Sequence, residues 1–239
     1  MDPTTLGRKP VLPHAVRTRL NGSAWALVLL VTIELATNFL SDDVRTSGLI
    51  GGGQTLPYRP LADAVWLGMM VTLLLGTTTL WLANQVERLS KALFLCAGVF
   101  TAQLLVATAL VVLRLVQGWK VAVATLILDA LIIFVTNVLV FALWYWLLED
   151  PRATAETAET RWHLLFPQRQ ANFAGYAGWS PHFLDYLFVA YTTSVAFSPT
   201  DTLPLSRAAK LLMMTQSIIA LITITVVAGT AINLLANNA

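Results

Sequence analysis

Long apolar segments dominate this chain of 239 residues. An α-helix needs about 20 apolar residues to cross the roughly 30 Å hydrocarbon core of a bilayer. Five segments are near or above that length: Ala24–Leu40, Leu61–Ala83, Ala92–Leu113, Val121–Leu148 and Leu211–Leu235. Hydrophobic residues make up 56% of the chain and charged residues 12%, whereas soluble domains average about 25% charged. The sequence therefore predicts an all-α membrane protein with a four-helix transmembrane domain over 24–148.

The distribution of basic residues predicts the orientation of these helices. The N-terminal tail, 1–23, carries four Lys and Arg residues and runs directly into the first apolar segment. If this tail is cytoplasmic, nine Lys and Arg residues fall in inner segments and four fall in outer loops. Because inner loops of membrane proteins are enriched in positive charge, we expect a cytoplasmic N-terminus.

A polar connector, 149–181, separates the four-helix domain from the C-terminal part. Its stretch "AETAETRWHLLF" has two interpretations. It forms a short amphipathic helix at the membrane interface, with Trp162, Leu164, Leu165 and Phe166 on its apolar side, or it is a solvated connector.

The sequence holds no motif for catalysis or for a metal. Its three histidines are widely separated, its single cysteine, Cys96, lies inside an apolar segment, and no HExxH or CxxC pattern occurs. No nucleophile motif or nucleotide-binding loop is present. The formal charge of +2 is too small to indicate nucleic-acid binding. We expect no enzyme activity, no cofactor, no metal and no nucleic-acid partner.

Two acidic residues, Glu34 and Asp129, lie inside apolar segments. A charge at the centre of a membrane helix costs at least about 2.5 kcal/mol, so such residues usually face the bundle interior or water. They are either structural hydrogen-bonding partners or part of an ion or proton relay. Gln103 and Asn137 are expected to form hydrogen bonds between helices.

The C-terminal part, 182–239, begins with a segment that is short for a membrane span. Residues 182–198 number seventeen, and Asp185 shortens their apolar part further. Pro199 is expected to end their helix because proline cannot donate a backbone hydrogen bond. A polar stretch follows before the last apolar segment. Non-helical backbone at membrane depth must be buried in protein or line water. The pattern predicts a re-entrant, pore-like helix and loop followed by a final transmembrane helix. The alternative is a short, tilted span.

The stretch "LFVAYTTSVAFSPTDTLPLSRAAKLLMM" resembles the pore module of tetrameric potassium-type channels. Thr192 and Thr193 match the Thr-Thr pair of that module, Asp201 matches the acid after the filter, and Pro204 matches the following proline. The resemblance implies a pore or filter formed by Thr192, Thr193, Ser194, Val195, Ala196, Phe197, Ser198, Pro199, Thr200 and Asp201. The Gly-Tyr-Gly of that family is absent, so side-chain oxygens would contribute more of the ion coordination.

The overall layout also resembles an uncharacterised bacterial family of inner-membrane proteins. Members have four helices, a polar connector, an aromatic pore-like helix followed by F-x-x-S/T-D, and a terminal helix. The matching stretches are "FALWYW" at Phe141–Trp146 and "FSPTD" at Phe197–Asp201. This resemblance implies a multi-pass protein of the bacterial inner membrane and no particular activity.

Taken with the short C-terminal helix, these resemblances favour a channel-like protein. We expect a homo-oligomer, a tetramer, in the lipid bilayer that conducts monovalent cations through a central pore. The alternatives are a secondary transporter or proton-coupled carrier that uses Glu34 and Asp129, and a membrane scaffold that transports nothing.

Overall fold

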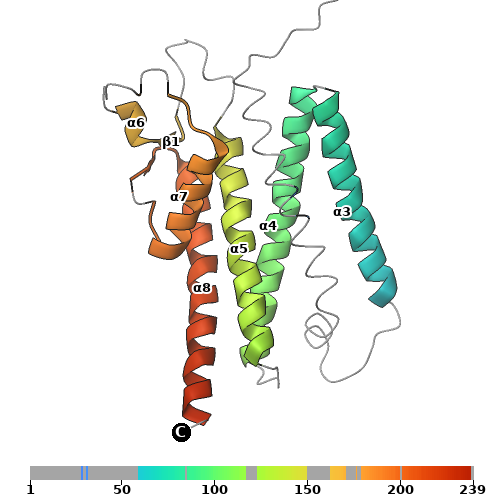
Figure 1. Cartoon of the computed structure of the whole chain (residues 1–239), viewed down its shortest axis with the longest axis vertical. Helices are drawn as coiled ribbons and strands as arrows, with labels where there is room; N and C mark the ends of the chain where they lie inside the picture. The colour runs from blue at the N-terminus through green and yellow to red at the C-terminus, as the bar shows by residue number, and fades with distance from the viewer. Residues whose placement is uncertain are drawn as a thin grey trace, which may run out of the picture.

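The computed structural model describes residues 28, 31, 59–83, 85–116, 123–149, 162–170, 176, 179–199 and 201–237. The predictions for the basic tail, for Glu34 and for Thr200 lie outside these residues. The elements are α3 (Arg59–Leu82), α4 (Val86–Val116), α5 (Val123–Leu148), β1 (Leu164–Leu165), α6 (Pro167–Gln170), α7 (Phe183–Ala196), β2 (Leu203–Pro204) and α8 (Arg207–Asn237) (Figure 1).

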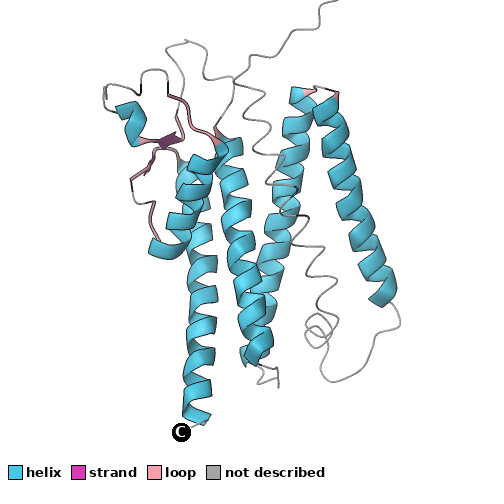
Figure 2. Cartoon of the chain, viewed as in Figure 1, coloured by secondary structure: helices cyan, strands magenta, loops and turns pink. Residues whose placement is uncertain are grey.

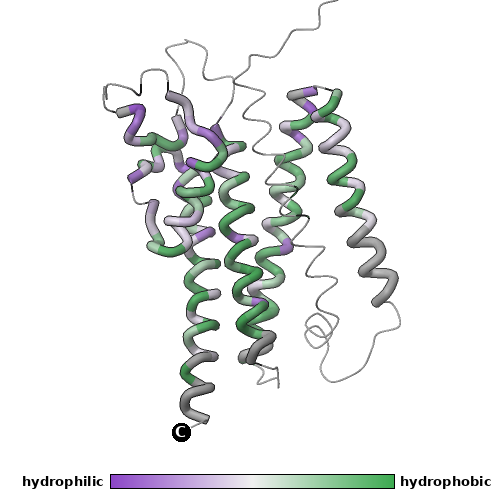
Figure 3. Tube along the Cα trace, viewed as in Figure 1, coloured by the Kyte–Doolittle hydropathy of each residue, from purple (hydrophilic) through white to green (hydrophobic). Residues whose placement is uncertain are grey.

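The described part of the chain is mostly helical, which confirms the predicted helical class (Figure 2). Among the described residues, three stretches are long and apolar enough to cross a bilayer: Arg88–Leu113, Leu126–Leu148 and Arg207–Thr230. Hydrophobic residues run along these helices, whereas hydrophilic residues gather around α6 (Figure 3).

Helix α5 is the centre of the bundle. It packs against α4 on one side and against α7 and α8 on the other, while α3 packs on the outside of α4 (Figure 1). From Thr136 to Leu143 every residue of α5 is buried. A segment that is buried around its whole circumference has a helix neighbour on each face, whereas Ile127, Leu128, Leu131 and Val135, nearer the start of α5, are exposed.

The described part of the connector contains a strand. Leu164 and Leu165 form β1, which pairs antiparallel with β2, so that Leu164 lies opposite Pro204 and Leu165 opposite Leu203. Leu164 and Phe166 are buried and Leu165 is half-buried. This alternation is the period of a strand, so residues 164–165 are not part of the amphipathic helix that was one of the two interpretations. Their apolar side chains cover the end of the bundle.

Helix α7 has only 14 residues, about 21 Å at 1.5 Å per residue. It ends at Ala196, two residues before the predicted end, because Phe197 adopts a left-handed conformation with φ 55° and ψ 21°. From there the chain runs back to β2, beside β1 (Figure 1). Both ends of the segment 183–206 therefore lie at the same end of the bundle, where α5 ends and α8 begins.

Candidate functional site

A buried polar network holds the last turns of α7 against α5 and α8. Gln216 of α8 donates from Nε2 to the carbonyl oxygen of Ala190 at 2.7 Å and to Ser194 Oγ at 2.8 Å. Asn137 of α5 donates from Nδ2 to Ser194 Oγ at 3.3 Å. Tyr145 of α5 donates its hydroxyl hydrogen to Gln216 Oε1. Asn137, Tyr145, Ser194 and Gln216 are fully buried, so these bonds form away from water.

The network fixes how far α7 extends along its neighbours. At 1.5 Å per residue, Gln216 lies about 14 Å from the start of α8, and Asn137 lies about 17 Å from the end of α5. The last turn of α7 therefore lies about a third of the way along α8 and about two fifths of the way back from the end of α5. The interhelical role predicted for Asn137 is confirmed. Sequence reasoning missed Gln216, although it is the only amide side chain between Lys210 and Asn233.

The predicted pore residues fall into two groups. Thr192, Thr193 and Ser194 are buried against the rest of the same chain, and Thr192 Oγ1 donates to the carbonyl oxygens of Phe188 at 3.0 Å and Val189 at 3.1 Å. The second group is at the surface of the chain: Val195, Ala196, Phe197, Ser198 and Asp201 are exposed and Pro199 is half-buried. We call residues 195–199 the α7 tip. In the single chain, the tip and Asp201 are available to an ion or to another subunit.

Phe197 gives the tip an unusual backbone. It is the only non-glycine residue with positive φ in the described part of the chain. The left-handed region costs an L-residue roughly 1–2 kcal/mol, and glycine is the residue usually found there at a helix C-terminus. A bulky residue in this conformation at the end of a short helix makes the tip a candidate functional position.

Asp129, the one of the two acidic residues in apolar segments that the structure describes, lies apart from this network. Asp129 is half-buried on α5. It lies eight residues before Asn137, which is about 12 Å along the helix axis. This distance leads away from the end of α5 where Glu149 lies. The structure therefore does not bring Asp129 to the α7 tip.

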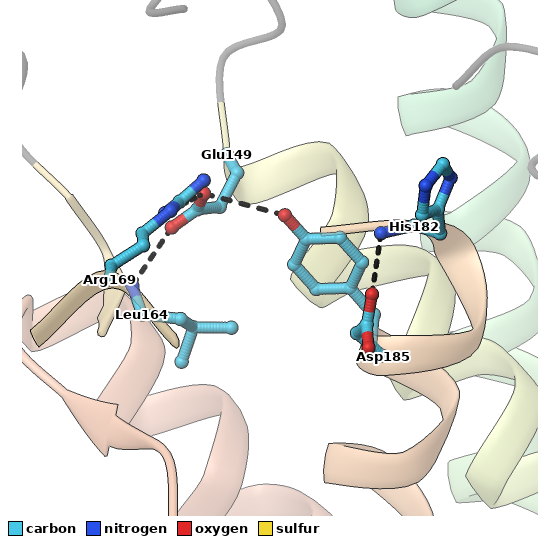
Figure 4. A network of polar contacts seen from close by, with 6 residues as sticks. Glu149, Leu164, Arg169, His182 and Asp185 are labelled. Atoms are coloured by element: carbon cyan, nitrogen blue, oxygen red, sulfur yellow. Dashed lines mark hydrogen bonds and ion pairs between the residues drawn. The ribbon is translucent and has the colours of Figure 1, made fainter. Parts of the chain in front are cut away.

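Glu149, at the end of α5, connects three segments (Figure 4). Its carboxylate accepts hydrogen bonds from the Leu164 backbone N–H at 3.1 Å, from Arg169 Nη1 at 3.1 Å and from the Tyr186 hydroxyl at 3.4 Å. The Arg169 guanidinium also lies 3.7 Å from the centre of the Trp162 ring. The carboxylate is buried and is satisfied by these donors, so it fixes the connector and the first turn of α7 to α5.

The other end of the segment is fixed to the same connector. The Leu205 backbone N–H donates to the carbonyl oxygen of His163 at 2.9 Å. His163 Nδ1 and Ser206 Oγ are 2.8 Å apart, and Ser206 Oγ accepts from the Ala209 backbone N–H, which caps α8. At the start of α7, the Asp185 carboxylate accepts from the His182 backbone N–H at 2.6 Å (Figure 4). The connector thus holds the chain entering α7 and the chain leaving the tip.

The described residues include no group of three or more His, Cys, Asp or Glu side chains placed to hold a metal ion. Cys96 is a buried free thiol on α4. No protein-family model, curated protein or solved structure matches this chain.

Proposed function

We propose that the chain is a channel-like, multi-pass protein of the bacterial inner membrane. Its copies form a homotetramer that conducts monovalent cations past the α7 tip. The first apolar segment, α3, α4 and α5 span the membrane, α7 enters it and returns, and α8 spans it last. With a cytoplasmic N-terminus and four preceding spans, α7 enters from the cytoplasmic side.

The half-length of α7 is the observation that carries this proposal. Its 14 residues cover about 21 Å, less than the roughly 30 Å hydrocarbon core. The Gln216 and Asn137 hydrogen bonds hold its last turn about 14–17 Å along two helices of membrane-spanning length. The non-helical residues after Ala196 would then lie deep in the membrane. There they must be covered by protein or face water, and a water-filled pathway meets that requirement.

The electrostatics of the tip favour a cation. The C-terminal end of a helix carries about half a negative charge, because its last carbonyl groups lack helical N–H partners. In α7 this end coincides with the exposed Ser198 hydroxyl. Asp201 adds an exposed negative charge on the return path, outside the tip. In cation channels, backbone carbonyl oxygens replace the hydration shell of the ion, and rings of acidic side chains favour cations over anions.

Ion flux through the purified full-length protein in liposomes tests this function. We expect wild type to carry K⁺ or Na⁺ down a gradient, and Asp201→Asn to slow that flux several-fold because a negative charge beside the return path is lost. Asp129→Asn is the matched control, since it also removes an acid but lies away from the tip. Its flux should equal that of wild type.

Two results would refute the channel. One is a folded wild-type protein that passes no cation. The other is a flux that survives Asp201→Asn but is lost in Asp129→Asn, which is the behaviour of a carrier that uses the membrane acids. Thermal unfolding of each variant in detergent separates an effect on conduction from an effect on folding.

A further inference from the structure

Helix α7 has an apolar face that its own chain does not cover. Leu184, Phe188, Tyr191 and Val195 follow one another at spacings of four, three and four residues, so they form one stripe along the helix. Each is between 48% and 71% exposed. The opposite face of α7 is buried against α5 and α8. We call these four residues the α7 stripe.

Helix α8 carries a second uncovered stripe. Leu211, Met214, Ile218 and Leu221 follow one another at spacings of three, four and three residues, and each is between 53% and 63% exposed. We call these four residues the α8 stripe. This spacing places all four side chains along one seam, as in helices that pack against a partner helix.

The two stripes lie at the same level of the molecule. Gln216, in the middle of the α8 stripe, is hydrogen-bonded to Ala190 and Ser194, which lie within the range of the α7 stripe. Cyclic symmetry in a membrane has its axis along the membrane normal. Rotation about that axis does not change the depth of any residue, so only surfaces at equal depth meet between neighbouring copies. The α7 stripe and the α8 stripe meet this condition.

Charges of opposite sign flank the stripes at the connector end. Asp201 is exposed between the tip and β2, and Arg207 and Lys210 are exposed in the first turn of α8. These three side chains make no ion pair within the described part of the chain. A neighbouring copy that packs its α8 against α7 therefore brings the positive charges of its Arg207 and Lys210 toward the negative charge of Asp201. Such complementarity fixes the orientation of an interface.

We propose that the α7 stripe of one copy binds the α8 stripe of the next, with Asp201 facing Arg207 and Lys210 of that copy. Two different surfaces meet in this contact, so it is heterologous, and repetition about the four-fold axis of the tetramer proposed above closes it into a ring. The inference rests on the re-entrant placement of α7 proposed above. The neighbouring copy also shields the non-helical tip from lipid, which cannot form hydrogen bonds with the backbone of the tip.

Disulfide cross-linking between two tagged copies tests this interface. In a Cys96→Ala background, one copy carries Tyr191→Cys and the other carries Ile218→Cys. After oxidation in membranes, we expect a disulfide between the two tags when the copies are co-expressed and none when either variant is expressed alone. Leu105→Cys replaces Tyr191→Cys in the control, because Leu105 is an exposed apolar residue on α4. This control should not cross-link.

The charge pair gives a second measurement. Asp201→Lys in the Tyr191→Cys copy should lower the yield of the disulfide several-fold, and Lys210→Asp in the Ile218→Cys copy should restore it. No disulfide in the Tyr191–Ile218 pair would overturn the interface, as would cross-linking of a single variant with itself or equal cross-linking from Leu105. Cross-linking without ion flux would refute the channel and leave the interface standing. Ion flux without cross-linking would refute the interface and leave the channel standing.

Discussion

Glu149→Ala is expected to lower the free energy of unfolding by about 3–5 kcal/mol, the usual cost of removing one partner of a buried ion pair. The substitution leaves the Arg169 guanidinium without its carboxylate in a largely buried position. It also removes the acceptor of the Leu164 backbone N–H and of the Tyr186 hydroxyl. The measurement is equilibrium unfolding of the purified protein in detergent, followed by tryptophan fluorescence.

Two further variants show whether the loss comes from the Glu149 network. Glu149→Gln keeps an oxygen that can accept from Leu164, so its effect should be smaller than that of alanine. Gln85→Ala removes an exposed polar side chain outside the network and should change the unfolding free energy by no more than about 0.5 kcal/mol. If Glu149→Ala were as mild as Gln85→Ala, the connector would not be what anchors α7.

Gln216→Leu should have the second largest effect on stability. Its side chain makes three buried hydrogen bonds, to Ala190, Ser194 and Tyr145. Hydrogen bonds between membrane helices are worth about 0.6 kcal/mol on average, so we expect a loss of about 2 kcal/mol in the same unfolding assay. The larger consequence is positional, because α7 loses the bonds that set its depth along α8.

Gln103→Leu is the matched control for Gln216. Gln103 is a half-buried amide on α4 whose Oε1 has no hydrogen-bond partner in the described part of the chain. Replacing it with leucine should leave stability unchanged or slightly higher. Equal losses from the two variants would mean that the Gln216 network contributes nothing specific to the position of α7.

The helices of this protein were largely predictable from the sequence. The apolar segments predicted at 61–83, 92–113, 121–148 and 211–235 correspond to α3, α4, α5 and α8 with shifts of a few residues at most ends. Length and hydropathy suffice for this because a helix satisfies its own backbone hydrogen bonds. The shortness of α7 was equally visible, since Pro199 and the polar residues beyond it limit the apolar run.

The strand pairing of the connector was not predictable. β1 and β2 have two residues each and are nearly forty residues apart in the sequence. Two residues are too few to show a periodicity. The buried positions of Leu164 and Phe166 depend on the end of a bundle that forms elsewhere in the chain.

The sequence predicted which segment forms the candidate site, but not the contacts and the backbone conformation that hold that segment in place. The sequence indicated the segment from Thr192 to Asp201 and the interhelical role of Asn137. It did not indicate that Thr193 and Ser194 are buried against other helices of their own chain. Which side chains of α7 are buried depends on where α5 and α8 lie. It also gave no reason to place a left-handed residue at Phe197, where a bulky side chain makes that conformation unfavourable.

The central claim is that α7 enters the membrane and returns, and cysteine labelling tests it most directly. His182 and Arg207 are exposed residues at the two ends of the segment. In the Cys96→Ala background, His182→Cys and Arg207→Cys are treated in separate samples with a membrane-impermeant thiol reagent, applied from one side of sealed vesicles and then from the other. A re-entrant α7 predicts that both cysteines react from the same side. Reaction from opposite sides would mean that the segment crosses the membrane completely, and would contradict the account.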